Sequence, residues 1–209
     1  MTRIAYLYVF DTMADWEPGF LIAELNSGRY FRKDAEEYIV RTVGLTREPV
    51  TTMGGVHIVP DMHLEECIAA DAGVLILPGG DTWLEEIHAP IMQKAQEFMD
   101  AGVLVAAICG ATMGLAKAGI LDSRPHTSND RGYLKAVIPA YKGEAFYSQK
   151  TVVTSGRLIT ATGVAPIDFA REVLGELGVF SARTLDAWYR LYITHEAQYF
   201  YALIESLES

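Results

Sequence analysis

The sequence is poor in cysteine, with only Cys67 and Cys109, and its 17 basic residues are outnumbered by 27 acidic ones. Two cysteines make no disulfide framework, so reduced thiols and a cytoplasmic location are expected. No basic-then-apolar signal sequence precedes the first predicted strand, and no apolar run reaches the roughly 18 residues that span a bilayer. The formal net charge of −10 disfavours nucleic acid and anionic membranes as partners.

The chain also lacks Pro/Gly/Ser-rich linkers, charge runs and internal repeats. Its 209 residues, 50% of them hydrophobic, are enough for one well-filled α/β domain. We therefore expect a single domain over residues 1–209, in which residues 180–209 form a helical C-terminal extension with aromatic faces.

Strand-like and helix-like patterns alternate along the chain. Strands are predicted at 3–10, 38–45, 73–77 and 103–108, with a turn of the chain near Gly54 and a tight hairpin over 151–161. Helices are predicted at 18–26, 89–101, 165–177, 184–192 and 195–207. This alternation favours one doubly wound, mostly parallel sheet sandwiched by helices, of the flavodoxin-like kind, with additional C-terminal helices.

The buried strand over 103–108 passes directly into an Ala-rich helix at Cys109. Small residues flank this junction, as a nucleophile on a tight strand-to-helix turn requires. The helix amino terminus should favour the thiolate, so we expect Cys109 to titrate well below the ordinary value of about 8.5. The local pattern leaves open the alternative of a cysteine that simply packs as a small hydrophobe.

Ligands of open α/β sheets bind at the carboxyl ends of the strands, where the segments 11–17 and 78–81 are expected to meet Cys109. Glu17 could there set the protonation of the thiol, although an acid at a helix start is also explained by the helix dipole. Asp15 competes for the same role.

Backbone N–H groups of Gly80 and Gly110 could hold a developing oxyanion, although the Gly79–Gly80 pair is also typical of a simple turn. His126, in the loop after the helix, could carry protons if residues 120–121 return toward the sheet as a strand. A surface histidine without a function is the alternative for His126.

Metal chemistry has little support in the sequence. His57, Asp61 and His63 match no zinc spacing, and His195-Glu196 lacks the second histidine of a zincin. We expect no metal and no cofactor.

The segments Leu75-Ile-Leu-Pro-Gly-Gly80 and Ala106-Ala-Ile-Cys-Gly-Ala111 resemble the ThiJ/PfpI family of the class I glutamine amidotransferase-like superfamily, over about residues 3–177. The resemblance implies a nucleophilic Cys109 with Glu17 as the acid beside it. It also implies Gly80 and Gly110 as backbone donors, His126 as a nearby histidine, and a homodimer.

Two departures from the family pattern reduce the number of activities that we expect. Intracellular protease-like members have histidine directly after the nucleophile, where this chain has Gly110. Glutamine amidotransferases carry a late His-x-Glu pair, and residues 160–166 contain no histidine. Peptidase and glutaminase activities are therefore disfavoured.

The main functional hypothesis is a cysteine-dependent enzyme of the hydrolase or lyase type that acts on a small carbonyl or acyl-like substrate. Reactive α-oxoaldehydes are the substrates that the resemblance implies. One alternative is a redox-responsive or ligand-binding protein in which Cys109 is oxidised and turnover is slight. Another is an interaction module that uses the aromatic C-terminal extension.

Overall fold

The computed structural model describes residues 2–207 and contains a seven-stranded sheet in the order β5-β2-β1-β6-β7-β9-β8. Its strands are β1 (Thr2–Tyr8), β2 (Glu37–Gly44), β5 (Met62–His63), β6 (Ala72–Leu77), β7 (Leu104–Ile108), β8 (Val152–Ser155) and β9 (Leu158–Ala161). All neighbouring strands pair in parallel except β8 and β9. The carboxyl ends of β1, β6, β7 and β9 therefore meet at one edge of the sheet.

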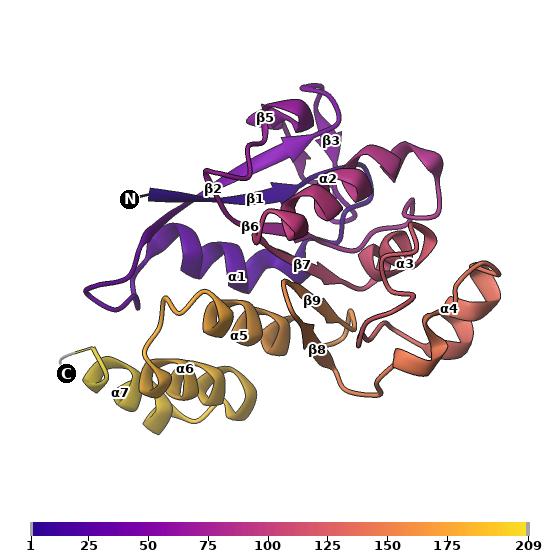
Figure 1. Ribbon diagram of the computed structural model, residues 1–209. Coiled ribbons are helices and arrows are strands. Elements are labelled where there is room, and N and C mark those ends of the chain that lie inside the picture. The colour runs from indigo at the N-terminus through magenta and orange to yellow at the C-terminus, as the bar shows by residue number, and fades with distance from the viewer. Residues whose placement is uncertain (1, 208–209) are drawn as a thin grey trace.

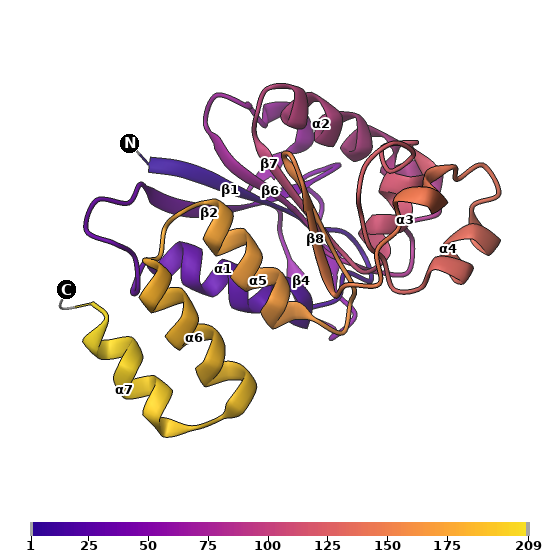
Figure 2. The same ribbon diagram turned by 60° about the horizontal axis from the view of Figure 1, so that its bottom comes forward.

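Helices cover both faces of the sheet (Figures 1 and 2). Helices α2 (Ala89–Asp100) and α3 (Gly110–Lys117) lie on one face, and α1 (Trp16–Ser27) and α5 (Pro166–Glu176) on the other. The α6 helix (Ala182–Thr194) packs on α5, and α7 (Ala197–Glu205) packs on α6. The prediction of a doubly wound sheet with additional C-terminal helices is confirmed.

Shorter elements fill the connections. The turn near Gly54 joins a small hairpin of β3 (Val50–Thr51) and β4 (His57–Ile58), as the sequence predicts. Helix α4 (Arg131–Val137) and the 3-10 turns η1 (Leu64–Glu66), η2 (Glu86–His88) and η3 (Gly143–Phe146) complete the described chain. The expected return strand at residues 120–121 is wrong, because Ile120 and Leu121 form a buried turn after α3.

The central strands are buried on both faces because helices lie above and below them. Every residue of β7 is buried, which explains its uninterrupted apolar sequence. Within residues 2–207, no helix combines the length and apolar character that crossing a membrane requires.

Candidate active site

Cys109 lies at the junction of β7 and α3, with φ 59° and ψ −123°. Non-glycine residues rarely adopt such a backbone, which costs roughly 1–3 kcal/mol and persists only where the surroundings fix it. The Cys109 N–H donates to Ala161 O (2.9 Å), and the Cys109 carbonyl accepts from the Thr112 N–H (3.1 Å) and hydroxyl (2.6 Å). The strained turn is therefore held from both sides.

Glycines bring the backbone close to the thiol. A Cβ at Gly163 would lie 2.6 Å from the Cys109 Sγ, and a Cβ at Gly79 would lie 2.7 Å from the Cys109 Cβ. Both distances are shorter than real Cβ contacts allow. Any side chain at either position would therefore displace the cysteine or its neighbours.

Glu17 projects from the first turn of α1 and is 1% exposed. The Gly79 N–H donates to Glu17 Oε2 (2.5 Å), whereas Oε1 is buried without a hydrogen-bond partner. A Cβ at Gly163 would lie 3.1 Å from Oε1 and 2.6 Å from the Cys109 Sγ, so this oxygen and the sulfur border the same space. The competing Asp15 turns toward the β3–β4 hairpin, where it accepts from Thr52 Oγ1 (2.5 Å) and the Gly54 N–H (2.6 Å). Glu17 is the carboxyl group brought to the cysteine.

The pKa of the Cys109 thiol is raised to about 11, chiefly because the thiol is buried. The hydrogen bonds from Asn129 and the Gly110 N–H oppose this rise, and the neighbouring Glu17 charge adds to it. The expectation of a thiol that titrates below about 8.5 is therefore wrong. Desolvation in the site outweighs the helix amino terminus. Burial likewise raises the pKa of Glu17, although the hydrogen bonds with the Gly79 N–H and the thiol act to lower it.

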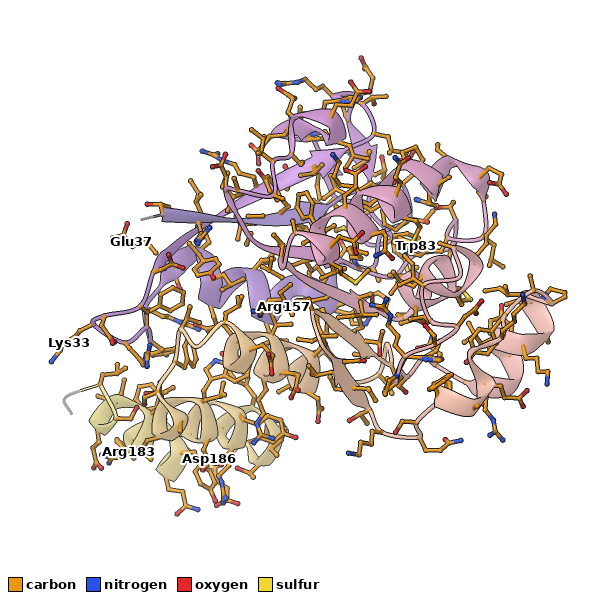
Figure 3. The ribbon with its side chains drawn as sticks, viewed as in Figure 1. Lys33, Glu37, Trp83, Arg157, Arg183 and Asp186 are labelled. Carbon is orange, nitrogen blue, oxygen red and sulfur yellow. The ribbon has the colours of Figure 1, made fainter. Side chains whose placement is uncertain are left out.

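The turn after β6 lies beside the start of α3. A Cβ on Gly110 would lie 3.2 Å from the Gly80 N, so the two amide groups expected to hold an oxyanion are neighbours. The buried Trp83 indole, labelled in Figure 3, lies against this start of α3. Its N–H donates to Pro78 O (2.9 Å), which helps to fix the turn.

His126 is fully buried, and both of its ring nitrogens are hydrogen-bonded away from the thiol. Nδ1 bonds to Arg124 O (2.8 Å), which can only accept, so this nitrogen carries the proton and Nε2 accepts from the Tyr141 hydroxyl (2.6 Å). Burial lowers the pKa of His126. The structure does not bring this imidazole into hydrogen-bond contact with Cys109.

Asn129 contacts the sulfur instead, and the sequence argument did not single it out. Its Nδ2 donates to the Cys109 Sγ (3.2 Å), and its Oδ1 accepts from the Gly163 N–H (2.8 Å) and Thr162 Oγ1 (3.3 Å). The loop that carries Asn129 has no periodic pattern that could have identified the residue. The only available signal was that the loop follows soon after the cysteine in the sequence.

The polar residues weighed as metal ligands make separate hydrogen bonds: Asp61 with Thr42, His57 with Thr51, and His63 with the Glu65 N–H. Residues 2–207 contain no group of three or more His, Cys, Asp or Glu side chains placed to hold a metal ion.

Solved structures with the same fold include two bacterial proteins. The thiJ/pfpI family protein from Bacillus anthracis is 51% identical, with a TM-score of 0.95 and coverage of 100% of this chain and 99% of its own. A DJ-1 superfamily protein from Agrobacterium tumefaciens is 32% identical, with a TM-score of 0.80 and coverage of 94% and 100%.

A curated relative, the "Uncharacterized protease YoaZ" of Bacillus subtilis, is 52% identical over 206 residues, which are 99% of this chain and 98% of the relative. The DJ-1/PfpI family model matches residues 3–176, which span the sheet, the strained cysteine and Glu17. The chain therefore belongs to the DJ-1/PfpI family.

Proposed function

We propose that the protein is a cysteine-dependent enzyme of the hydrolase or lyase type that acts on a small carbonyl or acyl-like substrate. The observation that supports this most is the pairing of a strained Cys109 thiol with a buried Glu17 oxygen that has no other partner. Buried acids with raised pKa values beside a nucleophile are typical of catalytic sites.

In the proposed reaction the S–H bond of Cys109 breaks as its proton passes to Glu17 Oε1. The electron pair left on sulfur forms a bond to the substrate carbonyl carbon, and the carbonyl π pair moves to oxygen. The N–H groups of Gly80 and Gly110 hold this oxygen. Glu17 then returns its proton to the oxyanion or to a leaving group.

His126 has no step in this scheme, because its two nitrogens are bonded to Arg124 and Tyr141. Its proposed part is to hold the loop that follows α3. No metal or cofactor is included in the scheme.

The alternative is a redox-responsive protein in which Cys109 is oxidised and turnover is slight. Cys109 is a free, partly exposed thiol, which an oxidant could reach. We favour the enzyme because an acid buried against the sulfur has an evident use in proton transfer. Both cysteines are free, which agrees with the proposed cytoplasmic location.

The deciding experiment measures steady-state turnover of methylglyoxal, a generic ester and a peptide by the protein and by Cys109→Ser. We expect turnover of a small carbonyl or ester substrate that falls by at least about 10³-fold in Cys109→Ser, with little peptide cleavage. Equal rates in both proteins would remove the proposal and favour the redox alternative.

We also propose that the protein forms a homodimer through its C-terminal helices. Three large apolar side chains of α7 are exposed: Phe200 (46%), Tyr201 (65%) and Ile204 (40%). Together with Ala197 they follow the i, i+3, i+4, i+7 spacing of one helix face. An apolar face of this kind is typical of an association surface.

A further inference from the structure

The side-chain amide of Asn129 has one orientation available to it. The Gly163 N–H, 2.8 Å away, can only donate and must meet the amide oxygen, which also accepts from the Thr162 hydroxyl at 3.3 Å. The amide NH₂ group therefore turns toward the Cys109 sulfur, 3.2 Å away. Within this network, a flipped amide would leave two donors facing each other.

The residues on each side of Asn129 are anchored. The Thr127 N–H donates to Thr160 Oγ1 (2.9 Å), and the Ser128 hydroxyl lies 2.6 Å from that of Thr112 in the first turn of α3. On the other side, Asp130 caps α4 by accepting from the Tyr133 N–H (2.6 Å). The amide donor is thus delivered to the sulfur by a loop fixed to β9, α3 and α4.

An amide N–H stabilises a negative sulfur but cannot accept a proton. The charged side chain that acts on Cys109 is Glu17 from α1, while Asn129 and the Gly110 N–H act as neutral donors. The donor and the proton acceptor thus come from different elements.

We propose that Asn129 is a catalytic residue that donates a hydrogen bond to the Cys109 sulfur and so promotes transfer of the thiol proton to Glu17. This inference rests on the proposed function for its role in turnover. The proton leaves sulfur for Glu17 Oε1, the electron pair stays on sulfur, and the Asn129 N–H holds that pair until the sulfur–carbon bond forms. The thiol is activated without an imidazole.

The test is the rate of Cys109 alkylation by iodoacetamide as a function of pH, in a Cys67→Ala background that leaves a single thiol. Asn129→Ala removes the donor, so the rate at pH 7 should fall by about 10-fold and the midpoint of the curve should move to higher pH. Asn129→Asp keeps an acceptor for the Gly163 N–H but places a carboxylate at the sulfur, so its shift should be larger.

The matched control is Asn26→Ala, since Asn26 also accepts a backbone N–H, from Val40 (3.2 Å), on an unrelated surface. Its curve should coincide with that of the parent protein. Circular dichroism and thermal unfolding check that each variant is folded. If Asn129→Ala fails to fold, Asn129→Asp decides alone. An unchanged curve in a folded Asn129 variant would overturn the inference.

Alkylation requires no substrate, which separates this inference from the proposed function. If the alkylation curve shifts but the protein turns over none of the substrates, the inference on Asn129 is supported and the proposed enzymatic function is contradicted. Where turnover is measurable, Asn129→Ala should lower kcat more than it raises KM, because the contact strengthens as charge develops on sulfur.

Discussion

Helix α1 buries two glutamates about two turns apart, and the protein uses them differently. Both are 1% exposed. Glu24 accepts from two nitrogens of Arg29 (2.9 and 2.5 Å) and from Trp188 Nε1 (3.0 Å) on α6, so both of its oxygens are paired. Glu17 accepts one backbone N–H, and its second oxygen is buried near the Cys109 sulfur without a hydrogen-bond partner.

This difference separates a structural carboxylate from one that is free to react. A buried charge with all its hydrogen bonds made stabilises the fold once it is in place, and removing it leaves its partners unsatisfied. A buried carboxyl group with an unpaired oxygen destabilises the fold, and its place beside Cys109 supports the proton-transfer role proposed for Glu17.

The largest expected effect is on turnover in Glu17→Gln. The amide can still accept the Gly79 N–H and donate to sulfur, but it cannot take the thiol proton, so kcat should fall by about 10²–10⁴-fold. Glu17→Leu should impair turnover similarly and should also lower the pKa of Cys109, because the Glu17 charge that raises it is gone while the Asn129 and Gly110 donors remain. Stopped-flow or steady-state assays measure both variants. Unimpaired turnover in both would contradict the division between the two glutamates and make Asp15 the next candidate.

The converse experiment is Glu24→Ala, which should reduce the free energy of unfolding by about 3 kcal/mol, since Arg29 and the Trp188 N–H lose their common acceptor. Urea unfolding followed by tryptophan fluorescence measures the loss. The folded fraction should keep its turnover. A loss below about 1 kcal/mol would place the Glu24 cluster among ordinary surface ion pairs.

The pH dependence of stability sharpens the same comparison. The folded-state pKa of Glu17 is raised above the ordinary 4.5, so the folded protein binds the proton more tightly than the unfolded chain. Glu17 therefore lowers stability as pH rises above 4.5, until it is ionised in both states. In a Cys109→Ser background, Glu17→Gln should gain stability relative to its parent over that range. Urea midpoints from pH 4 to pH 8 measure the difference, and a gap that does not change with pH would show that Glu17 titrates normally.

Substitutions on the exposed face of α7 are expected to have the smallest effect on the functions of Glu17 and Glu24. The double variant Phe200→Glu/Tyr201→Glu should convert the proposed dimer into a monomer of 23.0 kDa, with turnover unchanged. Asp186→Ala, on the outer side of α6 (Figure 3), is the control and should remain dimeric. Light scattering reports the mass, and a monomeric parent protein at micromolar concentration would contradict the dimer.

Much of the fold and part of the site could be predicted from the sequence, because those parts depend on local pattern. The apolar run of β7 ending at Cys109 predicted the strand-to-helix turn. The position of Glu17 after the first strand predicted that it lies at the carboxyl edge of the sheet. The family resemblance favoured Glu17 over Asp15, and the structure supplies the physical reason: Asp15 bonds to Thr52 of the β3–β4 hairpin instead.

The loop after α3 shows what sequence pattern could not supply. His126 and Asn129 are three positions apart, and chemistry alone favoured the histidine. Their places are set by partners distant in sequence, such as Tyr141 for His126 and Gly163 for Asn129. The pKa of Cys109 was likewise misjudged, because desolvation depends on the packed site around the thiol.

Thr112 fixes the orientation of the peptide unit between Cys109 and Gly110. The carbonyl of Cys109 and the N–H of Gly110 belong to one planar peptide unit and point in opposite directions. By holding that carbonyl with two hydrogen bonds, Thr112 prevents the peptide from flipping and keeps the Gly110 N–H pointing away from Thr112, on the side of the Cys109 sulfur. In the proposed reaction the Gly110 N–H is thus preorganised during folding, and no rearrangement of this amide has to precede the first catalytic cycle.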